Sequence, residues 1–304
     1  MKADYVWLNG ELVPFEQANV PFLSPTMHYG LGVFEGIRCY ETSGGAAVFR
    51  LSEHLQRLLD SALIFGIRDF PYTLQELREA TLETIRANGF NSCYIRPLIY
   101  LDGPLGLNLD AAEPRIGIAA WEWGAYLGEE ALETGVHMMV SSFTRHHINA
   151  SMTKAKISGN YVNSVLAKTL ALRSGYDEAI MLDPQGYVSE CSGENLFVVR
   201  AAEIRTPPRA TILEGITRDS VITLARDAGY MVTEELISRD QLYIADELFV
   251  CGTAAEVTPV RAVDHRTIGI GQRGPATQAL QQAFFETVNG EGERSAEWLE
   301  HVYE

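Results

Sequence analysis

Segments with strand character and segments with helical character follow one another along this chain without a regular strand–helix–strand alternation. Short apolar runs rich in β-branched and aromatic residues predict strands, whereas apolar residues spaced three and four apart predict helices. A doubly wound parallel sheet needs the regular alternation, so its absence predicts an α+β (mixed α/β) fold and argues against a dinucleotide-binding domain. The sequence also lacks a GxxxxGK[ST] motif, which argues against a P-loop.

Local turn and capping signals predict the first elements. Asn9-Gly10 stands between strand-like residues 5–8 and 11–13, and this dipeptide supplies the positive φ angles of a type I′ hairpin turn. Ser52 is expected to be the N-cap of a first helix, and Thr73-Leu-Gln-Glu76 fits the capping box of a second. Further strands are expected at 47–50, 93–101, 116–121, 136–142 and 247–251 and as a pair about 184–186, and further helices at 161–174, at 217–229 and after 275.

The stretch GAYLGEEALETG at 124–135 carries glycines and charges between two strand-like runs, which is typical of a linker. We therefore expect a smaller N-terminal α/β domain at 1–123, an interdomain linker at 124–134 and a larger C-terminal domain at 135–304. There is no internal repeat and no low-complexity segment.

Composition narrows the classes of function. The formal charge of −16 makes a nucleic-acid backbone an improbable ligand, although a few placed arginines could still bind a small anion. No apolar run approaches the roughly 18 residues of a membrane span, and the N-terminus has no pattern of a secretory signal. The four cysteines are widely spaced without a CxxC pair, so we expect reduced thiols and a cytoplasmic protein.

Eight segments carry most of the functional information. They are MHYGLGVFEGIRCY (27–40), EHLQRLLDSA (53–62), YIRPL (94–98), WGAYLG (123–128), KAKISGNYVNS (154–164), GYVSECSGENLFVV (186–199), LEGITRD (213–219) and CGTAAEVTPV (251–260). In this order they closely resemble the branched-chain amino-acid aminotransferases. These belong to the fold-type IV class of enzymes that depend on pyridoxal 5′-phosphate (PLP). The resemblance extends from residue 5 to about residue 290, and it implies a fold with the cofactor at the domain interface.

The resemblance implies that Lys156, and not its neighbour Lys154, forms the Schiff base with PLP. This chemistry needs a lysine whose amine can be neutral, because only the neutral amine attacks the aldehyde. Once released by the substrate, the same amine would act as the base that moves the substrate Cα proton. Lys156 is therefore the expected catalytic residue, in the C-terminal domain.

The other cofactor contacts are also implied by the resemblance. A carboxylate must keep the pyridine nitrogen protonated; Glu190 matches it, with Glu194 as the rival acid. The Tyr161 hydroxyl would bond the phenolic oxygen, and the phosphate would be bound by Arg57 and by the helix start at Thr217. The expected cofactor-binding set is Arg57, Lys156, Tyr161, Glu190, Gly193, Glu194, Asn195, Leu213, Gly215, Ile216, Thr217, Gly252 and Thr253.

A branched-chain enzyme must accept an apolar side chain in one half-reaction and the γ-carboxylate of glutamate in the other, so its pocket needs apolar walls and a positive rim. Tyr94 and Arg96 resemble the polar end and, two residues apart in a strand, face the same side. Leu107 resembles a loop residue that reaches the partner subunit's site, which implies a dimer as the catalytic unit, alone or as three dimers in a hexamer. The expected substrate set is Tyr29, Phe34, Gly36, Arg38, Tyr94, Arg96, Leu107, Trp123, Tyr126, Thr253 and Ala254.

The expected reaction is transamination of L-leucine, L-isoleucine and L-valine with 2-oxoglutarate, giving branched-chain 2-oxo acids and L-glutamate. A relative acting on D-amino acids or (R)-amines, or an aminodeoxychorismate lyase, is the alternative, and a non-enzymatic binding protein is a third. The signatures 34–38 and 94–96 favour the first, and retention of the lysine and the carboxylate argues against the third. No metal is expected, because His146 and His147 have no acid or cysteine at ligand spacing; the role of the loop Arg145-His146-His147 is left open.

Overall fold

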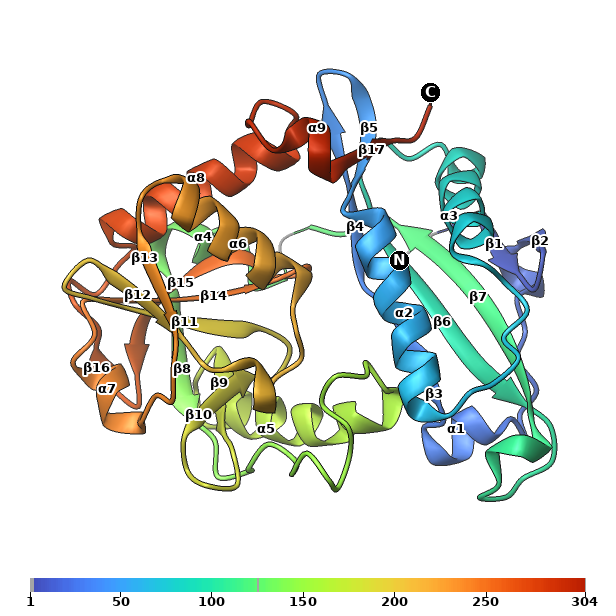
Figure 1. Cartoon of the computed structure of the whole chain (residues 1–304), viewed down its shortest axis with the longest axis horizontal. Coiled ribbons are helices and arrows are strands. Elements are labelled where there is room, and N and C mark those ends of the chain that lie inside the picture. The colour runs from blue at the N-terminus through green and yellow to red at the C-terminus, as the bar shows by residue number, and fades with distance from the viewer. Residues whose placement is uncertain (1–2, 125, 304) are drawn as a thin grey trace. The chain divides into compact units, whose positions relative to one another are not determined.

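The computed structural model describes residues 3–124 and 126–303, which fall into two compact units (Figure 1). The first unit takes in the described part of residues 1–123 together with 154–160 and 287–304, and the second takes in 124–153 and 161–286. The predicted division placed residues 154–160 and 287–304 in the C-terminal domain. They pack with the first unit instead, because Ile157 bridges Val33 and Leu299 pairs with Phe49. Residue 125 of the predicted linker lies outside the described residues.

The first unit is built on a sheet with the strand order β17-β5-β4-β6-β7-β1-β2, in which β3 also pairs with β6. Every strand pair of this sheet within the described residues is antiparallel. The predicted hairpin is confirmed, with φ of 50° at Asn9 and 105° at Gly10. The strands are β1 (Tyr5–Leu8), β2 (Glu11–Pro14), β3 (Gly32–Phe34), β4 (Ile37–Thr42), β5 (Gly45–Phe49), β6 (Cys93–Asp102), β7 (Glu113–Trp121) and β17 (Leu299–His301).

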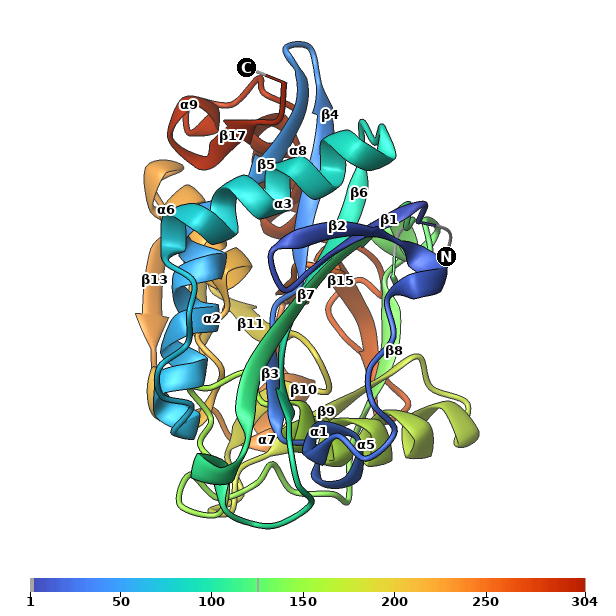
Figure 2. The same cartoon turned by 90° about the vertical axis from the view of Figure 1, so that its right-hand side faces the viewer.

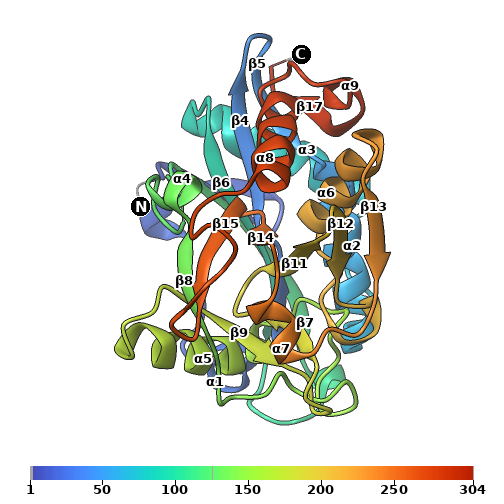
Figure 3. The same ribbon diagram turned by 90° about the vertical axis from the view of Figure 1, so that its left-hand side faces the viewer.

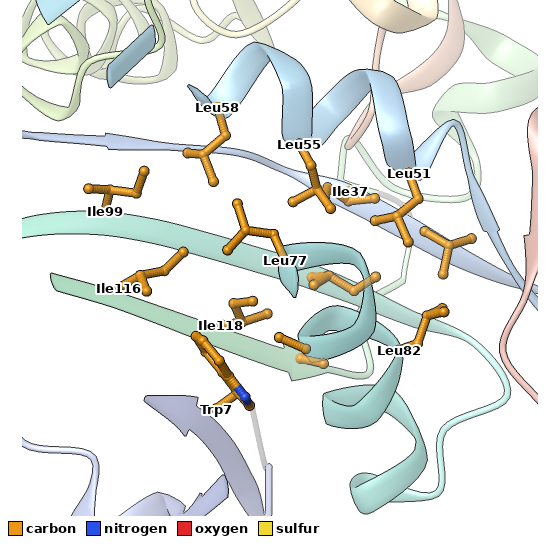
Figure 4. Packing of buried hydrophobic residues seen from close by; sticks show 14 of the residues in the cluster. Trp7, Ile37, Leu51, Leu55, Leu58, Leu77, Leu82, Ile99, Ile116 and Ile118 are labelled. Carbon is orange, nitrogen blue, oxygen red and sulfur yellow. The ribbon is translucent and has the colours of Figure 1, made fainter. Parts of the chain in front are cut away.

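Two long helices, α2 (Leu51–Phe65) and α3 (Leu74–Asn88), bury their apolar faces against this sheet. Leu55 and Leu58 of α2 and Leu77 of α3 are fully buried and meet isoleucines of the strands (Figure 4). Helix α3 packs on β1 and β7 (Figure 2). Each fully buried leucine contributes about 1.5–3 kcal/mol. This core therefore fixes the position of α2, which carries the predicted phosphate-binding residue Arg57.

The two helix starts differ in how well their sequence signals worked. The capping box at Thr73 is confirmed, because its hydroxyl accepts from the Glu76 N–H while the Glu76 carboxylate accepts from the Thr73 N–H. The N-cap expected at Ser52 is wrong. Helix α2 begins one residue earlier, after Arg50, whose backbone is left-handed and donates to the carbonyl of Trp298. A distant partner sets this helix start, so the local pattern does not reveal it.

The second unit is built on a mixed sheet with the order β10-β9-β8-β15-β14-β11-β12-β13, and β16 pairs with β15. The pairs β8–β9, β8–β15 and β12–β13 are parallel, and the other pairs described are antiparallel. The strands are β8 (Val136–Val140), β9 (Glu178–Leu182), β10 (Val188–Cys191), β11 (Asn195–Arg200), β12 (Glu203–Thr206), β13 (Met231–Glu234), β14 (Glu247–Gly252), β15 (Glu256–Val263) and β16 (Arg266–Thr267).

The helices of the second unit pack on individual strands: α5 on β9, α6 on β13 and β14, and α4 on β15 (Figure 3). Its helices are α4 (Ala131–Thr134), which lies inside the predicted linker, α5 (Tyr161–Arg173), α6 (Ile216–Asp227), α7 (Arg239–Tyr243) and most of α8 (Pro275–Val288). The 3-10 turn Arg209–Thr211 also belongs to this unit. The short helices of the first unit are α1 (Pro25–Tyr29), α9 (Ser295–Trp298) and the 3-10 turns Phe15–Gln17, Leu109–Ala111 and Ser158–Asn160. No helix in the described ranges has the length and apolar character to cross a bilayer.

The start of α8 is set by a buried carboxylate. Glu247 accepts from the N–H groups of Ala276 and Thr277 at 3.0 and 2.8 Å, which satisfies two donors of the first turn. The preceding stretch 269–274 happens to have the glycine spacing GxGxxG. It follows the two-residue antiparallel strand β16, and within the described residues no parallel strand follows α8, so it is not a dinucleotide-binding loop.

Candidate active site

Helix α2 anchors the predicted catalytic lysine. The Ser61 hydroxyl accepts the backbone N–H of Lys156 at 3.0 Å, and the Lys156 carbonyl accepts the N–H of Phe34 at 3.0 Å. The Lys156 Nζ lies 5.0 Å from the centre of the Phe34 ring, close enough for a cation–π contact when the amine is charged. The next residue, Ile157, is buried and bridges Val33. The lysine is thus held by its backbone on both sides.

Arg57, on the same helix, is paired with a carboxylate that has no exposed surface. Its Nε–H and Nη2–H donate to Glu35 Oε1 and Oε2 at 2.6 and 2.8 Å. His54 Nδ1 lies 2.8 Å from Glu35 Oε2, and the Gly36 N–H donates to the same oxygen at 3.3 Å. Burial would raise the pKa of Glu35, but the Arg57 charge and the hydrogen bonds from His54 and Arg57 outweigh it and hold this pKa far below its usual range. Glu35 is therefore a buried, fully paired anion.

The predicted polar end of the substrate pocket is a cation among aromatic rings. The Arg96 guanidinium carbon lies 4.7 Å from the centre of the Phe34 ring and 5.3 Å from that of Tyr94, and Nη2–H donates to the Tyr94 hydroxyl at 3.1 Å. The Trp123 ring meets Tyr94 edge-on at 4.6 Å. Arg96 Nε is buried and has no hydrogen-bond partner among residues 3–124 and 126–303. An orphaned cationic donor of this kind suits an anionic ligand group.

Gly36 and Arg38 belong to the same cluster. A Cβ at Gly36 would lie 2.0 Å from the Tyr94 hydroxyl oxygen, so only glycine lets the tyrosine pack there. Arg38 is buried and stands opposite Tyr94 in the β4–β6 register. Tyr29 and Leu107, by contrast, are 44% and 88% exposed on this chain. The structure therefore gathers Phe34, Gly36, Arg38, Tyr94, Arg96 and Trp123, and leaves Tyr29 and Leu107 on the surface.

In the second unit the predicted carboxylate Glu190 is buried at the end of β10. Arg145 donates its Nε–H to Glu190 Oε1 at 2.7 Å. The other oxygen accepts the Leu213 N–H at 3.0 Å and the Asn195 amide at 3.4 Å. The open question about Arg145 therefore has a structural answer: this arginine pairs with the carboxylate assigned to the cofactor ring.

The rival acid Glu194 has a different environment. Burial and the nearby charge of Glu178 raise the pKa of Glu194 to about 8, although Lys168 opposes the shift. The Gly193 N–H donates to its carboxyl group at 3.1 Å. At neutral pH Glu194 therefore holds its proton, whereas Glu190 is paired with a cation. This difference favours Glu190 as the carboxylate that keeps a ring nitrogen protonated.

The predicted anion site lies where α6 begins. Gly215 is the N-cap of this helix, and Ile216 and Thr217 form its buried first turn, where backbone N–H groups are not used within the helix. A Cβ at Gly215 would lie 2.1 Å from the Asn195 amide oxygen, so glycine permits this close approach. The same asparagine also donates to the Leu213 carbonyl, at 3.2 Å. Asn195 thus connects the Glu190 carboxylate to the helix start.

The remaining predicted residues of this unit lie on neighbouring turns. Gly252 ends β14, and a Cβ there would lie 3.3 Å from the Gly193 carbonyl, so the two loops are in close contact. Thr253 and Ala254 follow in the turn before β15 and are half-buried. Tyr161 is the first residue of α5. Tyr126 is 38% exposed, with Lys168 Nζ 5.2 Å from its ring centre.

Three residues that the sequence analysis did not assign are part of these clusters: Glu35, His54 and Arg145. Glu35 lies between the assigned Phe34 and Gly36, and His54 lies three residues before the assigned Arg57, so a charged or titratable residue inside a motif was the available signal. Arg145 lay outside every motif, so no local signal pointed to it. Among the described residues no three His, Cys, Asp or Glu side chains are placed to hold a metal ion.

Comparison with known proteins places these clusters in a family. Residues 32–263 match the family model described as amino-transferase class IV. A curated branched-chain-amino-acid aminotransferase of Pseudomonas aeruginosa is 50% identical over 96% of this chain and 95% of its own length. The crystal structure of the branched-chain amino acid aminotransferase of Escherichia coli superposes with a TM-score of 0.97 at 49% identity, covering 99% of this chain and 100% of that one.

A third similar protein, the branched-chain amino acid aminotransferase of Thermobaculum terrenum solved in its PLP form, has a TM-score of 0.92 at 34% identity and covers 99% of both chains. The fold and the similarity to these proteins together show that this chain is an aminotransferase. The chain belongs to the class IV aminotransferase family. The predicted mixed fold and the resemblance to branched-chain aminotransferases are both confirmed.

Proposed function

We propose that the protein uses PLP to transfer the amino group of L-leucine, L-isoleucine and L-valine to 2-oxoglutarate, giving branched-chain 2-oxo acids and L-glutamate. The observation that carries this proposal is the orphaned cationic donor of Arg96 among the rings of Phe34 and Tyr94. Aromatic walls can pack against an aliphatic side chain, and the arginine can donate hydrogen bonds to a γ-carboxylate. One pocket can then serve both half-reactions.

The donor set fits PLP. When bound, PLP supplies an electron sink that stabilises negative charge at the substrate Cα. Such a cofactor needs a lysine, a carboxylate for its ring nitrogen and several anion donors for its phosphate. Lys156 and Arg57 of the first unit, with Glu190 and the α6 start at Thr217 of the second, are those groups. We propose that all four act on one PLP molecule.

Each residue then has a stated task. The Lys156 amine moves the proton from the substrate Cα, and its fixed backbone limits where that amine can reach. Glu190, held by Arg145, keeps the ring nitrogen protonated. Tyr161 donates to the phenolic oxygen, and Thr253 and Ala254 donate backbone N–H groups to the substrate α-carboxylate. Lys156 is the catalytic residue, and the others bind and orient.

The decisive experiment is a parallel assay of L-leucine, L-isoleucine, L-valine, D-alanine and (R)-1-phenylethylamine with 2-oxoglutarate as acceptor. We expect turnover of L-leucine, L-isoleucine and L-valine well above that of the other two. If none of the three branched-chain L-amino acids is turned over, the proposal is wrong. Turnover of D-alanine or the (R)-amine alone would point to the alternative fold relatives.

We further propose a homo-oligomer whose catalytic unit is a dimer, located in the cytoplasm. Leu107 is 88% exposed, and α5 exposes Val162, Val165 and Leu172 at helical spacing, which is unusual for a surface that faces only water. The four cysteines are free and buried, which suits a reducing compartment. Light scattering of the purified protein distinguishes a monomer, which would contradict the proposal, from a dimer or a hexamer.

A further inference from the structure

Glu35 brings a negative charge into the interior of the first unit. Its side chain has no exposed surface, and a buried ion is strongly unfavourable unless it is paired and hydrogen-bonded. Here both oxygens are engaged by Arg57, and one of them also by His54 and by the Gly36 N–H. The cluster is thus complete around the carboxylate, and the reaction described above assigns it no task.

Glu35 fixes the orientation of Arg57. The two contacts at 2.6 and 2.8 Å use Nε–H and Nη2–H, so the plane of the guanidinium is set by the plane of the carboxylate. These contacts use two of the five N–H donors of an arginine. The Arg57 side chain keeps 14% of its surface exposed, whereas Glu35 keeps none, so the pair has a buried end and an accessible end.

His54 contributes a hydrogen bond and no second charge. Burial lowers the pKa of His54 more than the hydrogen bond to Glu35 raises it, so the ring is neutral near pH 7. Because the Glu35 carboxylate only accepts, the proton of the neutral ring must be on Nδ1. His54 therefore supports the carboxylate as a second donor without competing electrostatically with the charge pair.

The same short segment also holds the lysine. The residue before Glu35, Phe34, donates its backbone N–H to the Lys156 carbonyl, and α2 contributes both Arg57 and the Ser61 hydroxyl that binds the Lys156 N–H. The adjacent residues Phe34 and Glu35 therefore contact the lysine segment and α2, respectively, and hold the two together. A displacement of Glu35 would first change the orientation of the Arg57 guanidinium, because the two side chains are in direct contact.

We propose that Glu35 is a positioning residue: it holds the Arg57 guanidinium, with His54 as its second support, so that Arg57 binds the phosphate of PLP at little cost in side-chain entropy. This inference rests on the proposed role of Arg57 in binding phosphate. Preorganisation strengthens binding because a long side chain then loses less freedom when the ligand arrives.

The positioning role and a simple electrostatic argument predict opposite changes in phosphate affinity when Glu35 is replaced. A negative charge beside Arg57 opposes an incoming phosphate, so removing it would strengthen phosphate binding if charge alone mattered. If positioning dominates, Glu35→Gln weakens phosphate binding, since an amide presents N–H groups to the guanidinium and the imidazole that now point donor against donor. The direction of the change therefore decides between the two.

The experiment compares PLP with pyridoxal, which lacks the phosphate, in titrations of protein freed of cofactor. The dissociation constant of pyridoxal divided by that of PLP measures the phosphate contribution alone, and general damage to the fold cancels in this ratio. We expect Glu35→Gln to reduce the ratio about 10- to 100-fold, as loss of one well-placed hydrogen bond to a charged group implies, while pyridoxal binding is unchanged. An unchanged or larger ratio would overturn the proposal.

Arg57→Gln separates this inference from the proposed function. If Arg57→Gln leaves the ratio unchanged, Arg57 does not bind phosphate and the underlying assignment fails. If Arg57→Gln reduces the ratio but Glu35→Gln does not, only the positioning role is wrong. The double variant should lose no more than Arg57→Gln alone, because Glu35 acts through Arg57.

Two further variants complete the design. Glu300→Gln removes the partner of Arg78 in another ion pair of the same unit, at 2.8 Å, and should leave the ratio unchanged. Glu35→Asp keeps the charge but draws the carboxylate back by one methylene, so it should reduce the ratio by less than Glu35→Gln. If Glu35→Gln does not fold, Glu35→Asp carries the test, and a ratio equal to that of the unmodified protein would then refute the proposal.

Discussion

Arg145 and Glu190 form a buried ion pair, with Arg145 Nε 2.7 Å from Glu190 Oε1. The Arg145 and Glu190 side chains keep 10% and 7% of their surface exposed. Water can therefore stabilise neither charge well, and each is stabilised mainly by the opposite charge. Glu190 is the carboxylate proposed to bind the cofactor ring nitrogen, so this pair would link that ring to an arginine 45 residues earlier in the chain.

Replacing Arg145 with leucine should therefore harm both stability and activity. The buried carboxylate would lose its cation, which typically costs about 3–5 kcal/mol of folding free energy. Without the guanidinium the Glu190 carboxylate would no longer be held in place for the ring nitrogen, and we expect kcat to fall. Urea unfolding and kcat with L-leucine measure the two effects. Arg115→Leu, which removes an exposed pair with Glu113, is the control and should change neither.

Glu194 should make stability depend on pH. Its pKa of about 8 in the folded protein is above the roughly 4.3 of an unfolded glutamate, so the folded state retains a proton that the unfolded state releases between those values. Stability due to this group is therefore present at low pH and is lost as pH rises toward 8, by up to about 1.4 kcal/mol per pH unit. Glu194→Gln should gain stability relative to the unmodified protein between pH 5 and pH 8. Parallel unfolding curves for the two proteins across this range would contradict the assignment.

A methyl group at Gly36 should disturb the substrate pocket without unfolding the protein. The added Cβ would lie 2.0 Å from the Tyr94 hydroxyl oxygen, so the tyrosine must move and its contact with Arg96 is lost. We expect Gly36→Ala to raise KM for L-leucine and 2-oxoglutarate at least about tenfold, since a lost hydrogen bond to a charged group costs about 1.5–3 kcal/mol. Gly117→Ala in β7 is the matched control, because its Cβ would meet only Leu8 Cδ1 at 3.5 Å and the Trp7 carbonyl at 4.0 Å. Equal KM values in the two variants would show that Tyr94 does not line the pocket.

Arg96 should matter for one half-reaction more than for the other. If its orphaned donor binds the γ-carboxylate, Arg96→Leu removes that contact but adds apolar surface for leucine. We expect the half-reaction with L-glutamate to lose about 10²-fold in kcat/KM, in line with the worth of an arginine–carboxylate pair, and that with L-leucine to change little. Single-turnover spectra of the bound cofactor record each half-reaction separately. Equal losses of kcat/KM for L-glutamate and L-leucine would show that Arg96 does not distinguish the two substrates.

The two neighbouring lysines provide a direct test of the catalytic assignment. Lys156→Ala should retain some PLP without a covalent link and lose the spectral change caused by amino acids on the timescale of turnover. Lys154→Ala should retain both, because the assignment gives Lys154 no chemical task. Full activity in Lys156→Ala would show that another base serves the reaction.

Local signals in the sequence predicted local structure well. The hairpin turn at Asn9-Gly10 and the capping box at Thr73 were both found where expected, because each depends on hydrogen bonds within about four residues. The N-cap expected at Ser52 failed for the converse reason. Arg50 is fixed by the carbonyl of Trp298, a residue far away in the chain, and no window around Ser52 contains that information.

The sequence by itself determined the family and the residue types of the chemistry, because the motifs around Lys156, Glu190 and Thr217 keep their spacing along the chain. The tertiary structure alone decided which partners these residues have. The placement of residues 154–160 with the first unit, the Glu35–Arg57 pair and the Arg145–Glu190 pair each join segments that are distant in sequence. A buried charge must find an opposite charge wherever the folded chain brings one near, and the path of the chain cannot be read from the spacing of either residue.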